Sequence, residues 1–323
     1  MRHVKFYGFL LLGLFMTAAF ASDKTAVPKS EEAVESETPV ANILSLSAKQ
    51  ADWVFSGAVT NESGERYNYY FELQRNDQQF HAQAILVDAQ TGELVLHEQS
   101  DSVIDAPESS QWRVGKAFLR FNAINNSWIF GVKGKDKGFN FKVDMLGLSG
   151  NNYSRQQDIR NGIELLINQT GRLNGHLQTG ENNQEQFVTA KKAWFRQVWV
   201  SKPQTLGHPM TAVLCEFNDG GGFYAVNLKE ADALRGAVAG FRDQEGTAVP
   251  VSQFVTVKKD KDGLWVIHIP SPRLTLTLKD MLEQLDTSHQ LVAGLVKGVK
   301  PGFCAISLHD IGQPSVLPAQ KTA

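Results

Sequence analysis

Short stretches in which apolar and polar residues alternate make up most of the chain from about residue 43 onward. YNYYFELQR at 67–75 and FNFKVDMLGL at 139–148 show the pattern well. Because successive side chains of a strand point to opposite faces, each stretch gathers its apolar residues on one side. These sides carry Tyr67, Tyr69, Phe71 and Leu73 in the first stretch, and Phe139, Phe141, Val143 and Met145 in the second. The alternation therefore predicts β-strands with one buried face.

Turn-forming residues separate the alternating stretches at intervals of roughly ten residues. Turns are expected at 125–126, 219–222, 243–246 and 261–263, where glycine or asparagine occurs. Regular hairpins of this kind predict an all-β protein built as an antiparallel sandwich or barrel. The stretch 278–296 leaves two alternatives open, because its leucines have helical spacing while the β context favours an extended chain.

The first residues have the organisation of a secretory signal peptide. A basic start with Arg2 and Lys5 precedes an apolar run, and a small-x-small pattern follows at 19–21. The apolar run is short for a stable membrane span, although an uncleaved N-terminal anchor is the alternative. We therefore expect residues 1–21 to be removed after Ala21, which gives a periplasmic or secreted protein without a transmembrane segment.

The next segment, 22–42, is polar and acidic and contains two prolines. A segment of this composition cannot bury a core, so we predict a disordered linker. Roughly 300 residues remain after the signal peptide, which is more than one typical domain. We place an N-terminal domain at 43–199 and a C-terminal domain at 200–316.

Charge and cysteine content limit the possible partners and chemistry. The formal net charge of −2 becomes about −4 without Arg2 and Lys5, because 32 basic residues fall to 30 against 34 acidic ones. This mild acidity argues against a nucleic-acid partner, which needs a basic face. Cys215 and Cys304 are the only cysteines, and either a disulfide or two buried thiols is compatible with the sequence. Neither cysteine belongs to a C-x-x-C pair, so redox and zinc chemistry have no support.

Common catalytic signatures are absent from the sequence, including G-x-S-x-G, H-E-x-x-H, the P-loop and the dinucleotide fingerprint. The eight histidines lack metal-ligand spacing, so we predict neither a metal nor a cofactor. Glu72, Asp144 and Glu216 are acids within otherwise apolar strands, and we expect each to face solvent on the polar side of its strand. Glu216, with His208 nearby in the sequence, is the candidate for catalysis if an acid is needed.

Four stretches share the order and character of the motifs of one protein family. They are WVFSGAVTNESGERYNYYFEL at 53–73, FNFKVDMLGLSGNNYSRQQD at 139–158, TGRLNGHLQTGENNQEQFVTAKKAWFRQVW at 170–199, and CEFNDGG at 215–221 followed by GFRDQEGT. On these stretches the chain resembles the AttH/CrtC lipocalin-like family, which includes the carotenoid 1,2-hydratases. The resemblance covers roughly residues 50–270 and implies two tandem lipocalin-like antiparallel β-barrel domains.

The chain departs from the family pattern at one chemically important position. Arg196 stands where the family carries an aspartate, two residues after Trp194. A hydratase needs an acid to protonate an alkene, and arginine stays charged at any accessible pH. The resemblance therefore implies a ligand site that has lost this acid. The residues expected to line or close the site are Trp53, Tyr153, Ser154, Trp194, Arg196 and Trp199.

Strand alternation limits how the two tryptophans of this segment are used. Trp194 and Arg196 fall on one face of an extended strand, and Phe195 and Trp199 fall on the other. Arg196 is suited to an anionic head group or to an ion pair. One of the two tryptophans is expected to pack between domains.

Three functions are compatible with these features, in this order. The first is an exported protein that binds a hydrophobic or amphipathic small molecule, such as a lipid or an isoprenoid. The second is a hydratase or isomerase that acts on an apolar substrate, which requires a replacement acid. The third is a non-enzymatic scaffold of the cell envelope.

Overall fold

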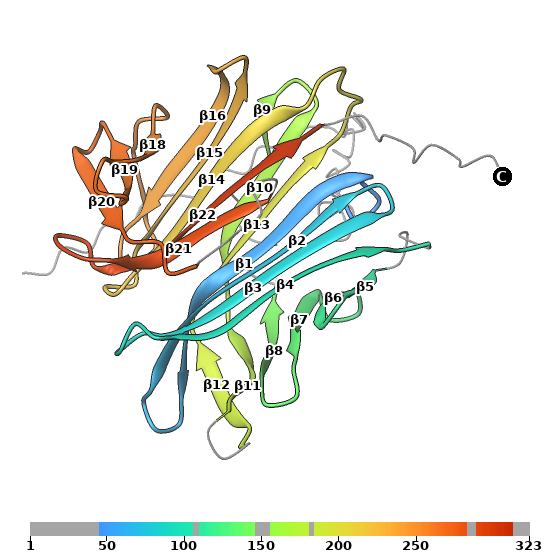
Figure 1. Cartoon of the computed structure of the whole chain (residues 1–323), viewed down its shortest axis with the longest axis vertical. Helices are drawn as coiled ribbons and strands as arrows, with labels where there is room; N and C mark the ends of the chain where they lie inside the picture. Colours follow the sequence, from blue (N-terminus) through green and yellow to red (C-terminus); the bar gives the residue numbers. More distant parts are fainter. Residues whose placement is uncertain (1–44, 106–109, 146–155, 181–183, 283–288, 313–323) are drawn as a thin grey trace, which may run out of the picture. The chain divides into compact units, whose positions relative to one another are not determined.

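Antiparallel strand pairing organises the described residues of the chain into two sheets, one of thirteen strands and one of nine (Figure 1). The computed structural model describes residues 45–105, 110–145, 156–180, 184–282 and 289–312. Within these ranges every regular element is a strand, so the extended alternative is correct for Gln290–Val296. No helix in the described part of the chain has the length and apolar character of a membrane span.

The first sheet runs through the N-terminal half of the described chain and curves into a nearly closed barrel. Its strands are β1 (Gln50–Asn61), β2 (Arg66–Asn76), β3 (Gln79–Asp88), β4 (Leu94–Val103), β5 (Gln111–Val114), β6 (Ala117–Asn122), β7 (Ser127–Lys133), β8 (Lys137–Asp144), β9 (Gln157–Arg160), β10 (Ile163–Thr170), β11 (Leu173–Thr179), β12 (Gln186–Ala190) and β13 (Ala193–Val200). The central strand β1 pairs with β2 on one side and with both β12 and β13 on the other.

The second sheet forms a half-barrel with the order β17-β16-β15-β14-β22-β21-β20-β19-β18. Its strands are β14 (His208–Phe217), β15 (Gly222–Glu230), β16 (Ala233–Arg242), β17 (Ala248–Val249), β18 (Thr256–Lys259), β19 (Trp265–Ile269), β20 (Leu274–Leu278), β21 (Gln290–Val296) and β22 (Gly302–Ile311). The four predicted turns each connect successive strands of one sheet. Together the two sheets confirm the predicted all-β fold of two lipocalin-like barrels.

The chain passes from one sheet to the other between Val200 and His208. This crossing falls next to the predicted division at 199 and 200, and the domain limits themselves remain predictions. The expected signal peptide, 1–21, and the expected linker, 22–42, lie outside the described residues.

Strand alternation sorts the buried side chains into three apolar cores. The first core fills the inside of the first sheet and includes both apolar faces predicted from 67–75 and 139–148. Its rings pack closely, as shown by the 4.3 Å between the stacked rings of Phe55 and Phe130. Aromatic pairs at this spacing add to the stabilisation from burial. The interior of the first sheet is thus a rigid support for residues on its other face.

The second core lies between the two sheets, on the face of the first sheet opposite to its aromatic interior. Val54, Val198 and Trp194 contribute from the first sheet, and Leu214 and Ala305 contribute from the second. Trp194 and Trp199 therefore point in opposite directions, which confirms the prediction from alternation. The first sheet is buried on both faces where the second sheet covers it.

The third core fills the concave side of the second sheet and contains the two cysteines. Cys215 on β14 lies directly opposite Cys304 on β22, with 4.1 Å between their Cα atoms, and the two form a disulfide. The structure thus selects the disulfide over the alternative of two buried thiols.

Trp194 makes a polar contact across the second core. Its indole nitrogen donates a hydrogen bond of 2.8 Å to Glu216 Oε2 on β14. The ring also lies against Gly222, where an added Cβ would approach the ring to 2.6 Å. Burial raises the pKa of Glu216 to about 7, although the hydrogen bond from Trp194 lowers it. Glu216 was expected to face solvent, and that expectation is wrong because the second sheet turns this face of β14 toward the first.

We predict that Glu216→Gln stabilises the protein at alkaline pH and has little effect at acid pH. The folded-state pKa of Glu216 is raised, so the folded protein binds more protons than the unfolded chain between the ordinary carboxyl pKa and about 7. Stability therefore falls as pH rises through this window, and glutamine, which keeps the acceptor for Trp194, escapes the loss. The free energy of unfolding of Glu216→Gln, relative to that of the parent protein, should rise by about 2 kcal/mol between pH 5 and pH 8. Urea unfolding followed by circular dichroism measures it.

Glu62→Gln provides the control, because Glu62 is an exposed residue of the β1–β2 hairpin. If the difference in free energy of unfolding between Glu216→Gln and the parent protein does not change with pH, the prediction is contradicted.

Candidate functional site

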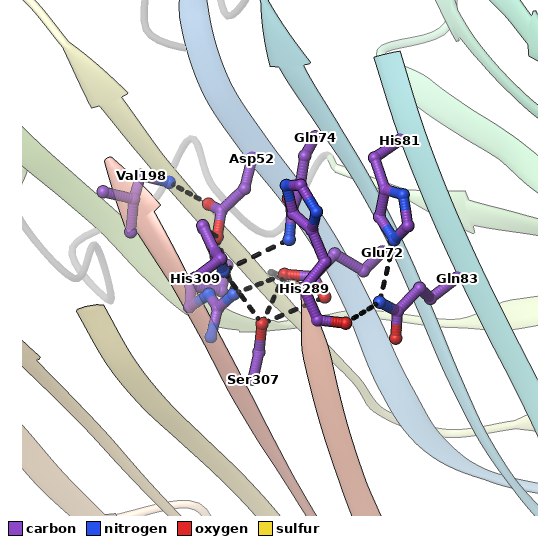
Figure 2. A network of polar contacts seen from close by, with 10 residues as sticks. Asp52, Glu72, Gln74, His81, Gln83, Val198, His289, Ser307 and His309 are labelled. Carbon is purple, nitrogen blue, oxygen red and sulfur yellow. Dashed lines mark hydrogen bonds and ion pairs between the residues drawn. The ribbon is translucent and has the colours of Figure 1, made fainter. Parts of the chain in front are cut away.

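A cluster of charged side chains is buried where the two sheets meet (Figure 2). Val54 of β1 lies opposite Glu72 of β2 and Arg196 of β13, and Asp52 of β1 lies opposite Val198. This register places Asp52, Glu72 and Arg196 on neighbouring rows of the face that looks toward the second sheet. Each has at most 1% of its surface exposed. Sheet pairing alone therefore brings together two carboxylates and one guanidinium.

Arg196 joins the two carboxylates through one nitrogen. Its Nη2 donates to Asp52 Oδ2 at 2.7 Å and to Glu72 Oε1 at 3.3 Å. The other oxygen of Asp52, Oδ1, accepts a 2.7 Å hydrogen bond from the backbone N–H of Val198. Burial opposes the charge of Arg196, but Asp52 and Glu72 outweigh this effect and raise its pKa. When both acids are ionised, the three groups carry one excess negative charge.

The second sheet contributes a serine and a histidine from β22. Ser307 Oγ donates to both oxygens of Glu72, at 2.9 and 3.1 Å. His309 Nδ1 lies 3.2 Å from the side-chain nitrogen of Gln74. An amide nitrogen can only donate, so Nδ1 accepts and the hydrogen of the neutral ring is assigned to Nε2. Nε2 lies 3.9 Å from Asp52 Oδ2, which leaves the two groups close without a direct hydrogen bond.

Burial and neighbouring charges shift the pKa values of Asp52, Glu72 and His309 in different directions. For Asp52, burial raises the pKa to about 6, while Arg196 acts in the opposite direction. For Glu72, burial also acts upward, but His309, Arg196 and the hydrogen bonds from Gln74 and Ser307 outweigh it and hold the pKa below its usual value. For His309, burial lowers the pKa to about 4, although Glu72 raises it. At neutral pH the imidazole is therefore neutral, and Asp52 is the group that gains or loses a proton most readily.

A cavity of about 980 Å³ opens beside this cluster. Asp52, Gln74 and His309 line it, and so do residues of β3, β4 and β14. Apolar contacts come from Phe80, Met210 and other side chains of its wall. The cavity thus combines apolar surface with a buried acid and a neutral imidazole.

Three histidines stand in a row along the cavity (Figure 2). The ring centroids of His81 and His289 are 4.4 Å apart, and those of His289 and His309 are 6.4 Å apart. His81 Nδ1 lies 2.7 Å from Asp101 Oδ1 at the exposed end of the row. The row links the buried cluster to the cavity mouth.

Gln83 connects this row to the second sheet. Its side-chain nitrogen donates to the backbone oxygen of His289 at 2.7 Å and lies 2.8 Å from His81 Nε2. The carbonyl partner fixes the amide nitrogen as a donor, so His81 Nε2 accepts and His81 Nδ1 carries the hydrogen toward Asp101. One glutamine therefore sets the tautomer of His81 and tethers the two sheets.

The buried cluster contains residue types that bind metal ions in other proteins. One ligand atom each of Asp52, Glu72 and His309 lies within 4.8 Å of the others. Arg196 already supplies a positive charge to both carboxylates and would repel a divalent cation. The donor set therefore fits an internal ion pair better than a metal site.

The structure separates the residues that the sequence had grouped as a ligand site. Trp53 and Trp199 lie in the aromatic core of the first sheet, and Trp194 lies between the sheets. Arg196 is buried against two carboxylates. Tyr153 and Ser154 lie outside the described residues. The cavity of about 980 Å³ is not lined by any of the four described members of this group, Trp53, Trp194, Arg196 and Trp199.

The candidates Glu216 and His208 are not brought together. Both belong to β14, and eight residues of an extended strand separate them by roughly 26 Å, at about 3.3 Å per residue. His208 is buried at the start of the strand, opposite Ile311. Glu216 is occupied by its hydrogen bond from Trp194.

Sequence reasoning missed the buried cluster because it treated the polar face of β1 and β2 as solvent-facing. Glu72 was expected to be exposed, and that expectation is wrong because the second sheet covers it. The sequence did contain a signal for this cluster. Asp52, Glu72 and Gln74 share the polar face of β1 and β2, whose opposite face is aromatic. Only the tertiary pairing with β22 shows that this face is covered.

We predict that Arg196→Met destabilises the protein by about 3 to 5 kcal/mol at neutral pH, because it leaves two neighbouring carboxylates buried without a cation. The loss should shrink as pH falls, since protonation removes the uncompensated charges. Urea unfolding at several pH values measures both effects. Arg235→Met is the matched control, because Arg235 makes a half-exposed ion pair with Glu230. If Arg196→Met loses as little stability as Arg235→Met, Arg196 is not essential to the cluster.

Comparisons with known proteins identify the fold but not the sequence family. No family model and no curated protein matches the chain. Among solved structures, a Nitrosomonas europaea protein with a provisional AttH assignment superposes with a TM-score of 0.52 at 13% identity, covering 83% of this chain and 94% of its own. Kievitone hydratase from Nectria haematococca superposes with a TM-score of 0.51 at 12% identity, covering 80% and 88%. The chain therefore has the two-barrel lipocalin-like fold of AttH/CrtC-type proteins, as its motifs predicted.

Proposed function

We propose that the protein binds a small amphipathic organic molecule in the cavity between its two sheets. The observation that carries this proposal is the cavity itself, whose 980 Å³ lies at the upper end of the usual range for small-molecule sites. Pockets of this kind combine apolar walls with a few polar groups that orient the ligand. Here the polar groups are Asp52, Gln74 and His309, and the walls include Phe80 and Met210.

The aromatic interior of the first sheet has a different role in this proposal. Phe55, Phe130 and Trp128 pack against one another there, with centroids of Phe55 at 4.3 Å from Phe130 and 5.9 Å from Trp128. Rings packed in this way stabilise the barrel and hold β1 and β2 in place behind the cavity. The ligand is therefore expected in the cavity beside this packed interior, which contributes Ala51 and Phe80 to the cavity wall.

Export of the protein is part of the same proposal. The expected signal peptide with cleavage after Ala21 implies a periplasmic or secreted location. The disulfide between Cys215 and Cys304 supports an oxidising compartment. The mass of the intact mature protein, purified from its native host, tests the cleavage site directly.

We predict that Thr211→Trp prevents ligand binding. Thr211 lines the cavity from β14 and is only partly buried, so a larger side chain there fills ligand space with limited strain on the core. Native mass spectrometry of the purified protein should show a bound small molecule in the parent and at least about tenfold lower occupancy in the variant. Thr256→Trp on the exposed face of β18 is the control. Equal occupancy in all three proteins would place the ligand elsewhere, and an empty parent protein would contradict the binding function.

A second candidate function is proton transfer to the bound molecule. Its supporting observation is that Asp52, whose pKa burial raises to about 6, lines the cavity next to His309. One of the similar structures is a hydratase, and hydration of an alkene requires a group that delivers a proton to carbon. Protonated Asp52 could deliver this proton, and the same carboxylate could accept one from the water that adds to the other carbon. Asp52, which forms an ion pair with Arg196, would thus supply the acid that is missing at position 196.

We predict that Asp52→Asn lowers turnover by about 100-fold or more if this second function holds, since general acid catalysis contributes on that scale. The rate of the parent protein should fall as pH rises above about 6, because only protonated Asp52 donates. The molecule identified by native mass spectrometry serves as the substrate, and gain of one water molecule or an isomeric shift is the readout. Measurement at saturating substrate separates turnover from affinity. Unchanged turnover in Asp52→Asn would remove the proton-transfer role and leave binding as the function.

A further inference from the structure

We propose that the contact between the two sheets beside the cavity is a pH-sensitive tether. The neutral ring of His81 holds Gln83 on the backbone of His289, and the protonated ring releases it. Loss of this contact at acid pH frees one wall of the cavity and lets a bound molecule leave. The release of a ligand rests on the proposed binding function, whereas the tether itself does not.

The tether consists of two hydrogen bonds donated by one amide nitrogen (Figure 2). Gln83 Nε2 lies 2.8 Å from His81 Nε2 and 2.7 Å from the backbone oxygen of His289. Gln83 and His81 belong to β3 of the first sheet, and His289 directly precedes β21 of the second. Each hydrogen of this nitrogen thus has its own acceptor, one on each sheet.

Protonation of His81 removes one of these acceptors. A neutral imidazole has one nitrogen that accepts, whereas both nitrogens of the charged ring donate. The protonated ring of His81 would therefore direct its Nε2 hydrogen at the amide hydrogens of Gln83. Histidine is the side chain that ordinarily changes its charge between about pH 5 and pH 8, so the tether is expected to respond in this range.

A turn of the Gln83 amide cannot restore both bonds. The turn places Oε1 where Nε2 stands, and this oxygen then accepts from the protonated ring of His81. The same oxygen would face the backbone oxygen of His289, which also only accepts. Oε1 is buried without a hydrogen-bond partner among the described residues, so no hydrogen bond of that oxygen opposes the turn. Acid pH thus exchanges a bond between the sheets for a bond within β3.

Two titratable groups lie directly against the ring of His81. Asp101 of β4 lies 2.7 Å from its Nδ1 and gives the charged ring a counter-ion. The ring of His289 is stacked on it, with 4.4 Å between the centroids, so positive charges on both rings would repel each other. His81 thus contacts both Gln83 and a carboxylate that can accompany its charge.

Other charged groups act on the tether less directly. Glu72 of β2 lies opposite Gln83 in the strand pairing, but its oxygens are bonded to Arg196 and Ser307. Burial lowers the pKa of His309 of β22 to about 4, so its ring is largely neutral between pH 5 and pH 8. The wall of the same cavity also carries Arg75, Lys229, Asp232 and Asp310.

The tether lies at the wall of the cavity, because His81, Asp101 and His289 all line it. When Gln83 no longer holds the backbone of His289, the start of β21 keeps its pairing with β22 but loses this bond to the first sheet. The wall on this side then opens more often, which gives a bound molecule a faster route out.

Hydrogen–deuterium exchange of the ligand-free protein tests the tether. The protection factor of the backbone amides at 290–292 should fall about three- to tenfold from pH 8 to pH 5, the scale expected for the loss of one hydrogen bond. His81→Gln should show no such fall, because glutamine keeps an acceptor for Gln83 and gains no charge. Gln83→Leu should show low protection at both pH values. His268→Gln, at an exposed position of β19, is the matched control and should behave as the parent.

The His81 variant is needed because other groups titrate over the same range. Burial raises the pKa of Asp52 to about 6 and that of Glu216 to about 7. A fall in protection that is equal in the parent and in His81→Gln would assign the effect to other groups and overturn the tether. Nitrogen NMR of the parent gives an independent check, since His81 should carry its hydrogen on Nδ1 at pH 8. A ring that carries it on Nε2 instead would also overturn the tether.

The fluorescent probe N-phenyl-1-naphthylamine tests the release step, because it is apolar and stays neutral from pH 5 to pH 8. Its affinity for the parent should fall about three- to tenfold from pH 8 to pH 5, stay constant in His81→Gln and be low at both values in Gln83→Leu. Circular dichroism checks that each protein is folded at both pH values. Equal affinity at both values in the parent would overturn the release step. If the probe does not bind at all, the binding function and the release step both fall, and the exchange measurements still decide the tether.

Discussion

The contact of Arg196 with Asp52 and Glu72 constrains how the two sheets meet. All three side chains are buried, and each comes from a different strand of the first sheet. Charges can be withdrawn from water only in the presence of partners, so β1, β2 and β13 must keep the register that brings these groups together. Ser307 then extends the constraint to the second sheet through its hydrogen bonds to Glu72. The polar cluster therefore specifies one arrangement of two surfaces that apolar packing alone would define less sharply.

The two faces of the first sheet divide the tasks of support and chemistry. Its concave face is filled by tightly packed rings, such as Phe55 and Phe130, which hold the strands in position. Its other face carries Asp52, Glu72 and His81, and the cavity opens where this face meets β14 and β22 of the second sheet. Because side chains alternate along a strand, a change on one face leaves the other largely intact. This arrangement allows proteins of one fold to differ in their ligands without loss of the barrel.

Alternation in the sequence predicted the strands, the turns and the opposite directions of Trp194 and Trp199. It could not predict the site, because alternation tells which residues share a face but not what covers that face. Glu72 and Ser307 are separated by 235 residues, and only the meeting of two sheets makes them neighbours. For the same reason the sequence placed Glu72 and Glu216 in solvent. The disulfide was one of two open alternatives, since only the register of β14 with β22 sets Cys215 opposite Cys304.

The proton on Asp52 connects the two functions proposed for the cavity. A proton on Asp52 removes the excess negative charge of its cluster, whereas ionised Asp52 relies on Arg196 and the backbone N–H of Val198. A neutral ligand leaves Asp52 protonated for part of the time near its pKa of about 6, so it can act as an acid. A cationic ligand favours the ionised carboxylate, which can orient the ligand or accept a proton but cannot donate one. The charge of the natural ligand therefore decides whether this site binds only or also delivers a proton, and the two roles of Asp52 exclude each other within a single complex.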